Sequence, residues 1–417
     1  MVRSEMRYLL ERKRDGAALC GEDWHRIIGW YMGGEIGEDQ MAALCMASVL
    51  RGMNTEETLA LTRAMVESGD VLQFDDAQVV DKHSTGGVAD ITSLLVVPMV
   101  AACGVAVAKL AGRALGHTGG TVDKLETIAG FKTNLSPLQF ASQVNSVGCA
   151  IAAQSESLVP ADKRLYALRD RTGTVPGSGL IAASIVSKKI AGGAKGIVYD
   201  VKAGRGAVMH DVAAAQELGH LLVEVTERLG RRSIAVVSNM DEPLGRSIGT
   251  GLEIIEARDF LSGASRDERV TELSLHLATQ MLHLAGKEQG ETTALRALQS
   301  GAAYEKFIAM IEAQGGSRQG LASMRPAQQD HDVRSTCAGF VGAIDAVQLG
   351  EAARRLSDVD RLAGIRTHVR VGDHADSGAL LATVYGDAQV QSLADAFTIV
   401  AAPPPQLPLI YETISSS

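Results

Sequence analysis

The chain has 417 residues, with 40 Lys and Arg against 49 Asp and Glu, which gives a formal net charge of −9. Hydrophobic residues make up 46% and charged residues 21%, as in an ordinary globular protein, so extensive disorder is not expected. Aromatic residues reach only 4%, and together with the acidic balance this argues against a broad nucleic-acid surface, which needs basic grooves and stacking rings. A compact site for a small anion is not excluded, because the local field matters there more than the net charge.

Targeting signals and membrane spans are not evident. Residues 1–15 carry Arg and Glu every few positions and lack the apolar segment of a signal peptide. The longest apolar run, residues 94–108, is too short to span a bilayer and contains Pro98 and Gly104. The cysteines lie far apart without a C-x-x-C pair, which is typical of reduced thiols. We therefore expect a soluble cytoplasmic protein.

In chain order, the hydrophobic pattern predicts a helical start and an α/β middle. Over the first 70 residues, apolar side chains recur at helical spacing. Beyond them, short apolar strands alternate with glycine-rich loops and helices, which is the rhythm of an α/β domain. A second helical stretch covers about residues 160–192. The expected strands lie at 79–80, 105–110, 196–201 and 233–238, and the expected helices between them and beyond at 90–103, 211–229 and 267–285.

Two later stretches complete this organisation. Residues 314–330 are rich in Gly, Ser, Gln and Ala, and they predict a linker. From residue 366 to residue 410, alternating apolar and polar side chains with Gly and Asp turns predict a small β-rich terminal unit.

The first candidate site is the loop of residues 82–87, Lys-His-Ser-Thr-Gly-Gly, with Ser93 one to two helical turns further on. Its glycines let backbone N–H groups close on an anion, and the N-terminus of the next helix adds partial positive charge. Lys82 supplies a formal charge, and Ser84 and Ser93 supply donors. The same pattern also suits a turn whose hydroxyls cap the next helix, and the residues alone leave the two interpretations level.

A second glycine loop, residues 112–121, follows the next expected strand. Two glycine loops that carry hydroxyl groups at neighbouring strand ends could bind one phosphate from two sides. This pattern favours a binding role for Thr121, whereas His117 is better explained as a turn histidine bonded to backbone.

The third candidate joins Arg169 with Ser184 and Lys188. Positions 184 and 188 share one helix face, because they lie four residues apart. A hydroxyl and an ammonium there, with a guanidinium from the preceding helix, would suit a planar polar heterocycle. A solvated charge run is the alternative interpretation.

Together these segments resemble the thymidine phosphorylase / pyrimidine-nucleoside phosphorylase family. The likeness covers nearly the whole chain in order. It is carried by KHSTGGVAD (82–90), GRALGHTGGTVDKLE (112–126), PADKRLYALRD (160–170) and ASIVSKK (183–189), with VLQFDD, DVKAGRGAVM and the terminal HVRVGD in support.

By this resemblance the fold is α/β, with a small all-helical domain, a larger α/β domain with a central mixed sheet, and a C-terminal β-rich α+β unit packed on the α/β domain. The expected ranges are 1–66 with 160–191 for the helical domain, 72–159 with 192–330 for the phosphate-binding α/β domain, and 335–417 for the terminal unit. Members of the family are homodimers paired through the helical domain. We therefore expect a homodimer with small-molecule substrates that binds neither nucleic acid nor membrane.

The resemblance implies reversible phosphorolysis, in which a thymidine- or uridine-like nucleoside and inorganic phosphate give the free base and (deoxy)ribose 1-phosphate. The catalytic positions of the family match His83, Arg169 and Lys188. Its phosphate contacts match Lys82, Ser84, Ser93 and Thr121. Its base and nucleoside contacts match Leu115, Tyr166, Arg169, Ile181, Ser184, Lys188 and Val208.

The implied mechanism follows from charge. Phosphate attacks C1′ while the glycosidic bond loosens through an oxocarbenium-like state. Arg169 and Lys188 would stabilise the negative charge on the leaving base, and His83 would give a proton or a hydrogen bond to a base carbonyl. No cofactor is required beyond phosphate as co-substrate. The family pattern also suggests a structural K⁺ near Leu244, Ser247 and Glu256.

The chain departs from the family pattern around both ligands. Ala111 stands where the family has a serine, which removes one phosphate hydroxyl. Val208 replaces an aromatic residue, Arg205 replaces a small one, and residues 176–179 replace the usual Asp-Ser-x-Pro. These base-side changes leave a modified nucleoside or a nucleotide open as the substrate.

Two other functions remain open from the sequence. An anthranilate-type phosphoribosyltransferase shares the architecture, but the Ser-Thr-Gly-Gly of the first loop disfavours it. A catalytically idle nucleoside-binding protein is disfavoured by the retained Lys82, His83, Arg169 and Lys188.

Overall fold

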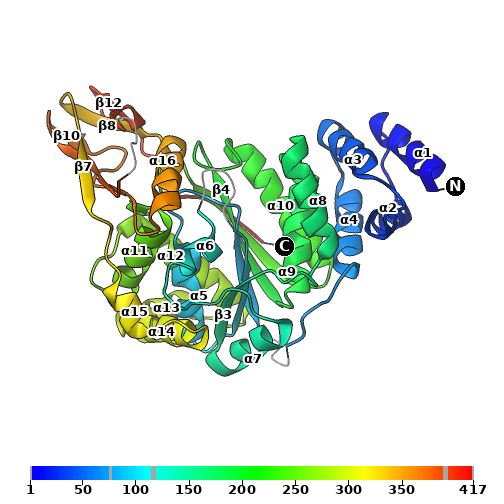
Figure 1. The fold of residues 1–417 in the computed structure, drawn as a ribbon, viewed down its shortest axis with the longest axis horizontal. Helices are drawn as coiled ribbons and strands as arrows, with labels where there is room; N and C mark the ends of the chain where they lie inside the picture. The colour runs from blue at the N-terminus through cyan, green and yellow to red at the C-terminus, as the bar shows by residue number, and fades with distance from the viewer. Residues whose placement is uncertain (1, 75–77, 114–118, 388–392, 416–417) are drawn as a thin grey trace.

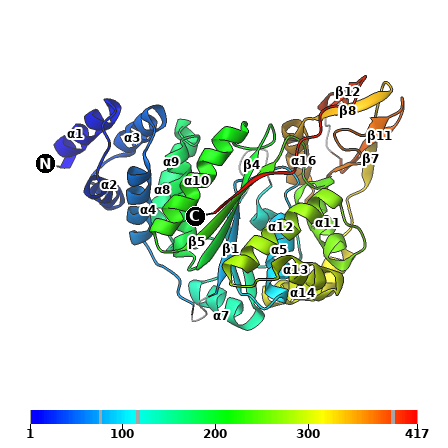
Figure 2. The same cartoon turned by 180° about the vertical axis from the view of Figure 1, so that it is seen from behind.

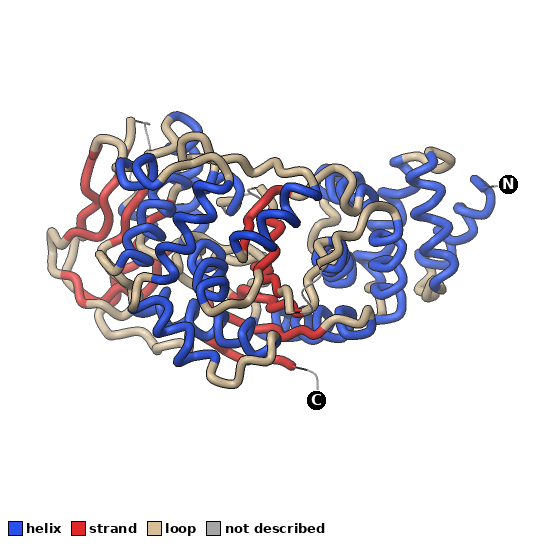
Figure 3. The backbone as a smooth tube through the Cα atoms, turned by 90° about the horizontal axis from the view of Figure 1, so that it is seen from below, coloured by secondary structure: helices blue, strands red, loops and turns tan. Residues whose placement is uncertain are grey.

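The computed structural model describes residues 2–74, 78–113, 119–387 and 393–415. Helices of the N-terminal region lie at one end of the molecule, a sheet with flanking helices lies in the middle, and a β-rich segment lies at the other end (Figure 1, Figure 2). The view from below shows the same order, with the central strands between the two ends (Figure 3). Over the described ranges, no helix combines the length and the apolar character that crossing a membrane requires.

The helical part is built from two stretches of the chain. It comprises α1 (Val2–Arg14), α2 (Gly21–Gly33), α3 (Glu38–Arg51), α4 (Thr55–Glu67), α8 (Pro160–Thr172) and α9 (Ser178–Ala191). Asn54 begins α4 with a reciprocal cap, in which its side chain accepts from the N–H of Glu57 and the Glu57 carboxylate accepts from the N–H of Asn54. Helix α4 packs along α9 and α3 contacts α8, so the later stretch completes the bundle.

The central sheet has the strand order β13-β5-β4-β1-β2-β3. Its strands are β1 (Val80–Ser84), β2 (Val107–Ala111), β3 (Cys149–Ala153), β4 (Gly196–Ala203), β5 (Arg232–Asn239) and β13 (Ile410–Ser415). Neighbours from β5 to β3 pair in parallel, whereas β13 runs antiparallel to β5, so the sheet is mixed. Because parallel strands end at one edge, the glycine loops that follow β1 and β2 begin side by side there.

Helices cover both faces of this sheet, which explains why β2 and β4 are buried along their whole length. One apolar cluster joins the strands to α5 and its neighbours, and another joins them to α9 and α10. The remaining helices of this region are α5 (Thr92–Ala102), α6 (Thr121–Leu125), α7 (Pro137–Val147), α10 (Val212–Arg228), α11 (Thr250–Ser262), α12 (Glu268–Leu284), α13 (Gly290–Gln299), α14 (Ala302–Ala313) and α15 (Arg318–Ser323).

The C-terminal part holds two small sheets around α16 (Ala346–Val359). One sheet has the order β10-β8-β12 and the other β6-β9-β11-β7. The strands are β6 (Ser247–Ile248), β7 (Gln329–Arg334), β8 (Gly339–Ile344), β9 (Gly364–Thr367), β10 (His374–Ala375), β11 (Leu380–Tyr385) and β12 (Phe397–Val400), and a short 3-10 turn spans Ala394–Ala396. The predicted fold class, with its helical, mixed-sheet and β-rich parts, is confirmed.

The structure differs from the expected layout at three places. The last strand, β13, leaves the C-terminal part and pairs with β5, because Ile414 is buried there in the apolar cluster beneath α10. Conversely, β6 lies outside the expected range 335–417 yet pairs with β9. The expected linker contains α15, where Ser317 accepts from the N–H of Gly320 and Leu321 is buried. Alternation alone does not say which sheet a strand joins.

Candidate active site

A cavity of about 470 Å³ lies where the loops after β1 and β2 face α8 and α9. It collects most of the side chains that the sequence singled out, from segments far apart in the chain. The predicted residues that line it are His83, Ser84, Ser93, Thr121, Tyr166, Arg169, Ile181, Ser184, Lys188 and Val208. Leu115 and His117 lie outside the described residues.

Hydroxyl groups and a helix end form one side of this cavity. Ser84 is the last residue of β1, Ser93 lies in the first turn of α5, and Thr121 begins α6. The N-terminus of α5 adds the partial positive charge of a helix start, which favours an anion. This side of the cavity is suited to phosphate.

Lys82 is not part of the cavity wall. Its side chain is fully buried, with Nζ 2.9 Å from a carboxylate oxygen of Asp200 and 2.6 Å from Oγ1 of Thr92. Burial lowers the pKa of Lys82, but Asp200 and Asp90 outweigh it and the net shift is upward. A buried ammonium needs a countercharge, and the neighbouring strand β4 supplies it, so Lys82 acts here as part of the core.

Lys109, rather than Lys82, is the strand lysine that lies on the cavity wall. It lines the cavity from β2, is buried, and makes no ion pair with any described residue, its Nζ lying 3.4 Å from the carbonyl of Leu110. Burial, followed by the repulsion of Lys189, lowers the pKa of Lys109 well below its usual range. A bound phosphate would supply the missing countercharge. In the sequence, the feature that could have pointed to Lys109 is a single lysine inside an otherwise apolar strand.

The opposite side of the cavity carries cations and a ring. Lys188 Nζ lies 2.5 Å from Asp162 Oδ2 and 2.7 Å from Ser184 Oγ, and it sits 5.8 Å from the ring centroid of Tyr166. Arg169 is buried, and three of its N–H groups donate to backbone carbonyls of residues 174, 175 and 180. Since a guanidinium has five N–H donors, Arg169 can still donate to a ligand.

His83 lies between the two sides. Burial first, and then the repulsion of nearby lysines led by Lys189, lowers the pKa of His83 well below its usual range. Its ring packs edge-on against Tyr199, with centroids 6.4 Å apart. At neutral pH the imidazole is therefore uncharged, which favours a hydrogen-bond role for His83 over donation of a full proton.

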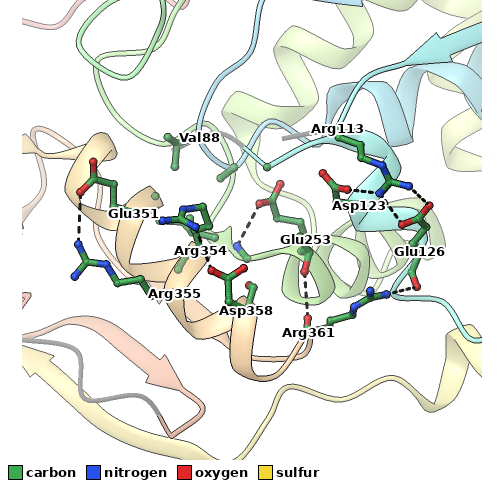
Figure 4. Close-up of a pocket in the computed structure, with 18 residues that line it drawn as sticks. Val88, Arg113, Asp123, Glu126, Glu253, Glu351, Arg354, Arg355, Asp358 and Arg361 are labelled. Carbon is green, nitrogen blue, oxygen red and sulfur yellow. Dashed lines mark hydrogen bonds and ion pairs between the residues drawn. The ribbon is translucent and has the colours of Figure 1, made fainter. Parts of the chain in front are cut away.

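A larger cavity, about 860 Å³, lies next to this one and shares Arg113 and Gly119 with it (Figure 4). Its arginines are engaged within the protein. Arg113 pairs with Asp123 and Glu126, and Arg361 donates to the carbonyl of Glu126. Arg354 pairs with Asp358 and Arg355 with Glu351 on α16. None of the predicted site residues that the structure describes lines it, so the smaller cavity is the candidate active site.

The segment expected to hold K⁺ has the oxygen chemistry that suits such an ion. Glu256 accepts from the N–H groups of Arg246 and Ser247 and makes no ion pair with a described residue. Burial raises the pKa of this carboxyl group. The carbonyl of Leu244 already accepts from Arg370, at 2.7 Å. A half-buried carboxylate with no ion-pair partner among the described residues fits a monovalent cation.

The chain matches the helical bundle domain of the glycosyl transferase family over residues 7–69 and its a/b domain over residues 76–304. The curated pyrimidine-nucleoside phosphorylase of Staphylococcus aureus (strain USA300) is 42% identical over 398 residues, which is 91% of this chain and 92% of that protein. The protein of the same name from strain MSSA476 gives the same figures. The solved anthranilate phosphoribosyltransferase of Thermus thermophilus has a TM-score of 0.62 at 22% identity, over 73% of this chain and 98% of that one, and shows the fold alone.

Proposed function

Because this chain belongs to the glycosyl transferase family, alongside the pyrimidine-nucleoside phosphorylases, we propose that it catalyses reversible phosphorolysis of a pyrimidine nucleoside. Inorganic phosphate and the nucleoside give the free base and (deoxy)ribose 1-phosphate. The observation that carries this proposal is one cavity with an anion-binding side at β1 and β2 and a side of cationic donors on α8 and α9. The enzyme is thus a pentosyltransferase.

The two sides divide the chemistry. Phosphate held by Ser84, Ser93, Thr121 and Lys109 attacks C1′ as the glycosidic bond breaks through an oxocarbenium-like state. The bonding electrons move onto the leaving base. Donors already fixed before the reaction stabilise such developing charge without reorganisation.

The base side favours a uracil-type ring. Lys188 and Arg169 present N–H donors, which suit the carbonyl oxygens of uracil or thymine as negative charge grows on them. A cytosine ring would turn its amino group, itself a donor, towards these cations. Neutral His83 adds an N–H donor whose strength does not change over the neutral pH range.

The assembly expected from the sequence is part of the same proposal. Tyr8 on α1 and Met46 and Leu50 on α3 are exposed large apolar side chains, and these two helices pack together. Exposed apolar side chains of this kind suit contact with a second copy of the chain. We place the homodimer contact on this surface of the helical part and the protein in the cytoplasm.

The proposed K⁺ would be held by Glu256 with oxygen atoms near Leu244 and Ser247. When bound, it would supply a positive charge next to the half-buried Glu256 and would tie the segment before α11 to the carboxylate. Its contribution is structural, and the transfer of the pentose does not pass through it.

The test of the function is release of free base from a panel of nucleosides, followed by chromatography, with and without phosphate. Cleavage of uridine or thymidine is expected only with phosphate or arsenate, with pentose 1-phosphate formed in the phosphate reaction. Equal cleavage without either anion would mean hydrolysis. Activity only with a pyrophosphate-bearing sugar and Mg²⁺ would mean a phosphoribosyltransferase.

A further inference from the structure

The hydroxyl group of Ser84 has a fixed direction of hydrogen bonding. Its Oγ lies 2.7 Å from Oδ2 of Asp90, and the backbone N–H of Gly86 donates to the same Oγ at 3.2 Å. An ionised carboxylate only accepts, so Ser84 must be the donor to Asp90. A hydroxyl oxygen has two lone pairs, and Gly86 uses one of them. Among the described residues no other donor reaches this oxygen, so towards the cavity Ser84 offers its remaining lone pair, which is an acceptor.

The surroundings of Asp90 keep this arrangement in place. Oδ1 of Asp90 accepts from the backbone N–H of Thr92 at 3.0 Å and from its hydroxyl at 2.5 Å. The ammonium groups of Lys202 and Lys82 lie 3.8 and 4.0 Å from Oδ2, and the Asp90 side chain is only 7% exposed. These donors and charges stabilise the ionised carboxylate, so Ser84 cannot readily turn its hydrogen towards a ligand.

We propose that the Asp90–Ser84 pair selects a protonated oxyanion, phosphate or arsenate, over sulfate in the anion side of the cavity. At neutral pH both ionic forms of phosphate carry at least one P–OH group, which can donate to the free lone pair of Ser84. Sulfate carries no proton at that pH, so one of its oxygen lone pairs would face the lone pair of Ser84. An acceptor that is left without a donor costs free energy, so the binding of sulfate is weakened. This inference rests on the proposed function, because it specifies which anion that site takes.

Ser93 provides the contrast within the same cavity. Its hydroxyl lines the anion side, and within the described ranges no hydrogen bond engages its Oγ. It can donate to an oxygen of either anion. Removing Ser93 should therefore weaken phosphate and sulfate alike, whereas removing Ser84 should affect the protonated anion.

The experiment is equilibrium binding of phosphate and of sulfate, measured by calorimetry on the full-length protein at pH 7 and matched ionic strength. The wild type is expected to bind phosphate at least about tenfold more tightly than sulfate. In Ser84→Ala, phosphate affinity should fall about tenfold with sulfate affinity unchanged or improved, since the hydrogen bond from the P–OH group is lost. In the control Ser93→Ala, both affinities should fall by a similar factor.

A second variant tests the carboxylate. Asp90→Asn removes the fixed acceptor and should raise sulfate affinity; should it fail to fold by circular dichroism, Ser84→Ala still decides the question. Equal binding of both anions by the wild type, or an equal loss for both in Ser84→Ala, would overturn the proposal. Phosphate-dependent base release is measured in parallel. If the enzyme releases base in a phosphate-dependent reaction but binds sulfate as tightly as phosphate, the selectivity is refuted and the proposed function stands.

Discussion

Asp162 of α8 holds the ammonium group of Lys188 of α9, with Oδ2 and Nζ 2.5 Å apart, at the wall of the candidate active site. The carboxylate is buried and the lysine side chain is 25% exposed. The same ammonium donates to Ser184. The contact fixes where one positive charge points before any base arrives.

We predict that Asp162→Asn lowers kcat/KM for the nucleoside about tenfold, or roughly 1.4 kcal/mol, because Lys188 loses its orientation. The KM for phosphate should not change, since the pair lies on the base side. Steady-state kinetics with each substrate varied in turn measure both quantities. Glu38→Gln is the matched control, because it breaks an exposed pair with Arg171 of α8, neither residue lines the cavity, and no effect is expected. A rise in phosphate KM in Asp162→Asn would contradict the assignment.

The two lysines of the phosphate region should behave differently. Lys109→Met is expected to raise the phosphate KM and to reduce kcat/KM roughly 10²–10³-fold, about 2–4 kcal/mol, because it removes the only lysine of β2 that could donate to phosphate and carry its countercharge. Lys82→Met is expected to lower the free energy of unfolding instead, by up to about 3–5 kcal/mol, because Asp200 loses one of its two ammonium partners. Kinetics together with urea unfolding separate the two effects. If Lys82→Met changed only the phosphate KM, the placement of its ammonium in the core would be wrong.

The depressed pKa of His83 predicts a pH dependence of stability. The unfolded imidazole gains its proton below about pH 6.5, whereas the folded one stays neutral until a lower pH. The contribution of His83 is therefore fully present above about pH 6.5 and is lost as the pH falls towards the folded pKa. Urea unfolding between pH 8 and pH 5 should show stability falling in the wild type by up to about 1.4 kcal/mol per pH unit more than in His83→Gln. Parallel curves would show that His83 titrates normally.

Val208 is predicted to set the width of the base pocket. It lies half-buried on the cavity wall, where the related enzymes are expected to carry an aromatic ring. Val208→Phe should shift preference from bulkier analogues towards uridine or thymidine, because the ring fills space and adds stacking of roughly 0.5–1.5 kcal/mol. The measurement is the ratio of kcat/KM values for a small and a bulky nucleoside in both proteins. If the ratio is the same in both proteins, or moves towards the bulky analogue in Val208→Phe, Val208 does not set the width of the base pocket.

The exposed apolar surface of α1 and α3 gives a test of assembly. Leu50 is 75% exposed there, and Leu50→Glu should shift a dimer towards monomer in sedimentation experiments, since it places a charge in an apolar contact. Leu138→Glu is the control, because Leu138 is 84% exposed on α7, outside the helical part. Dissociation by both changes, or by neither, would place the contact elsewhere.

The sequence by itself determined the local structure and the grouping of chemistry. Glycine loops after two strands, and Ser184 and Lys188 one helical turn apart, are local patterns that hold wherever the segments end up in space. These patterns predicted an anion side and a base side, and the structure brings both into one cavity. The resemblance extended that prediction to the family and its reaction.

Only the tertiary structure decided which lysine faces that cavity and which sheet receives the last strand. Lys82 and Lys109 lie in neighbouring strands and are both buried, but only Lys82 pairs with Asp200, which lies more than a hundred residues further along the chain. The segment Ile410–Ser415 could pair with any open strand edge, and burial of Ile414 beneath α10 selects β5. Countercharges and apolar burial partners are supplied by distant segments, so a local pattern cannot contain them.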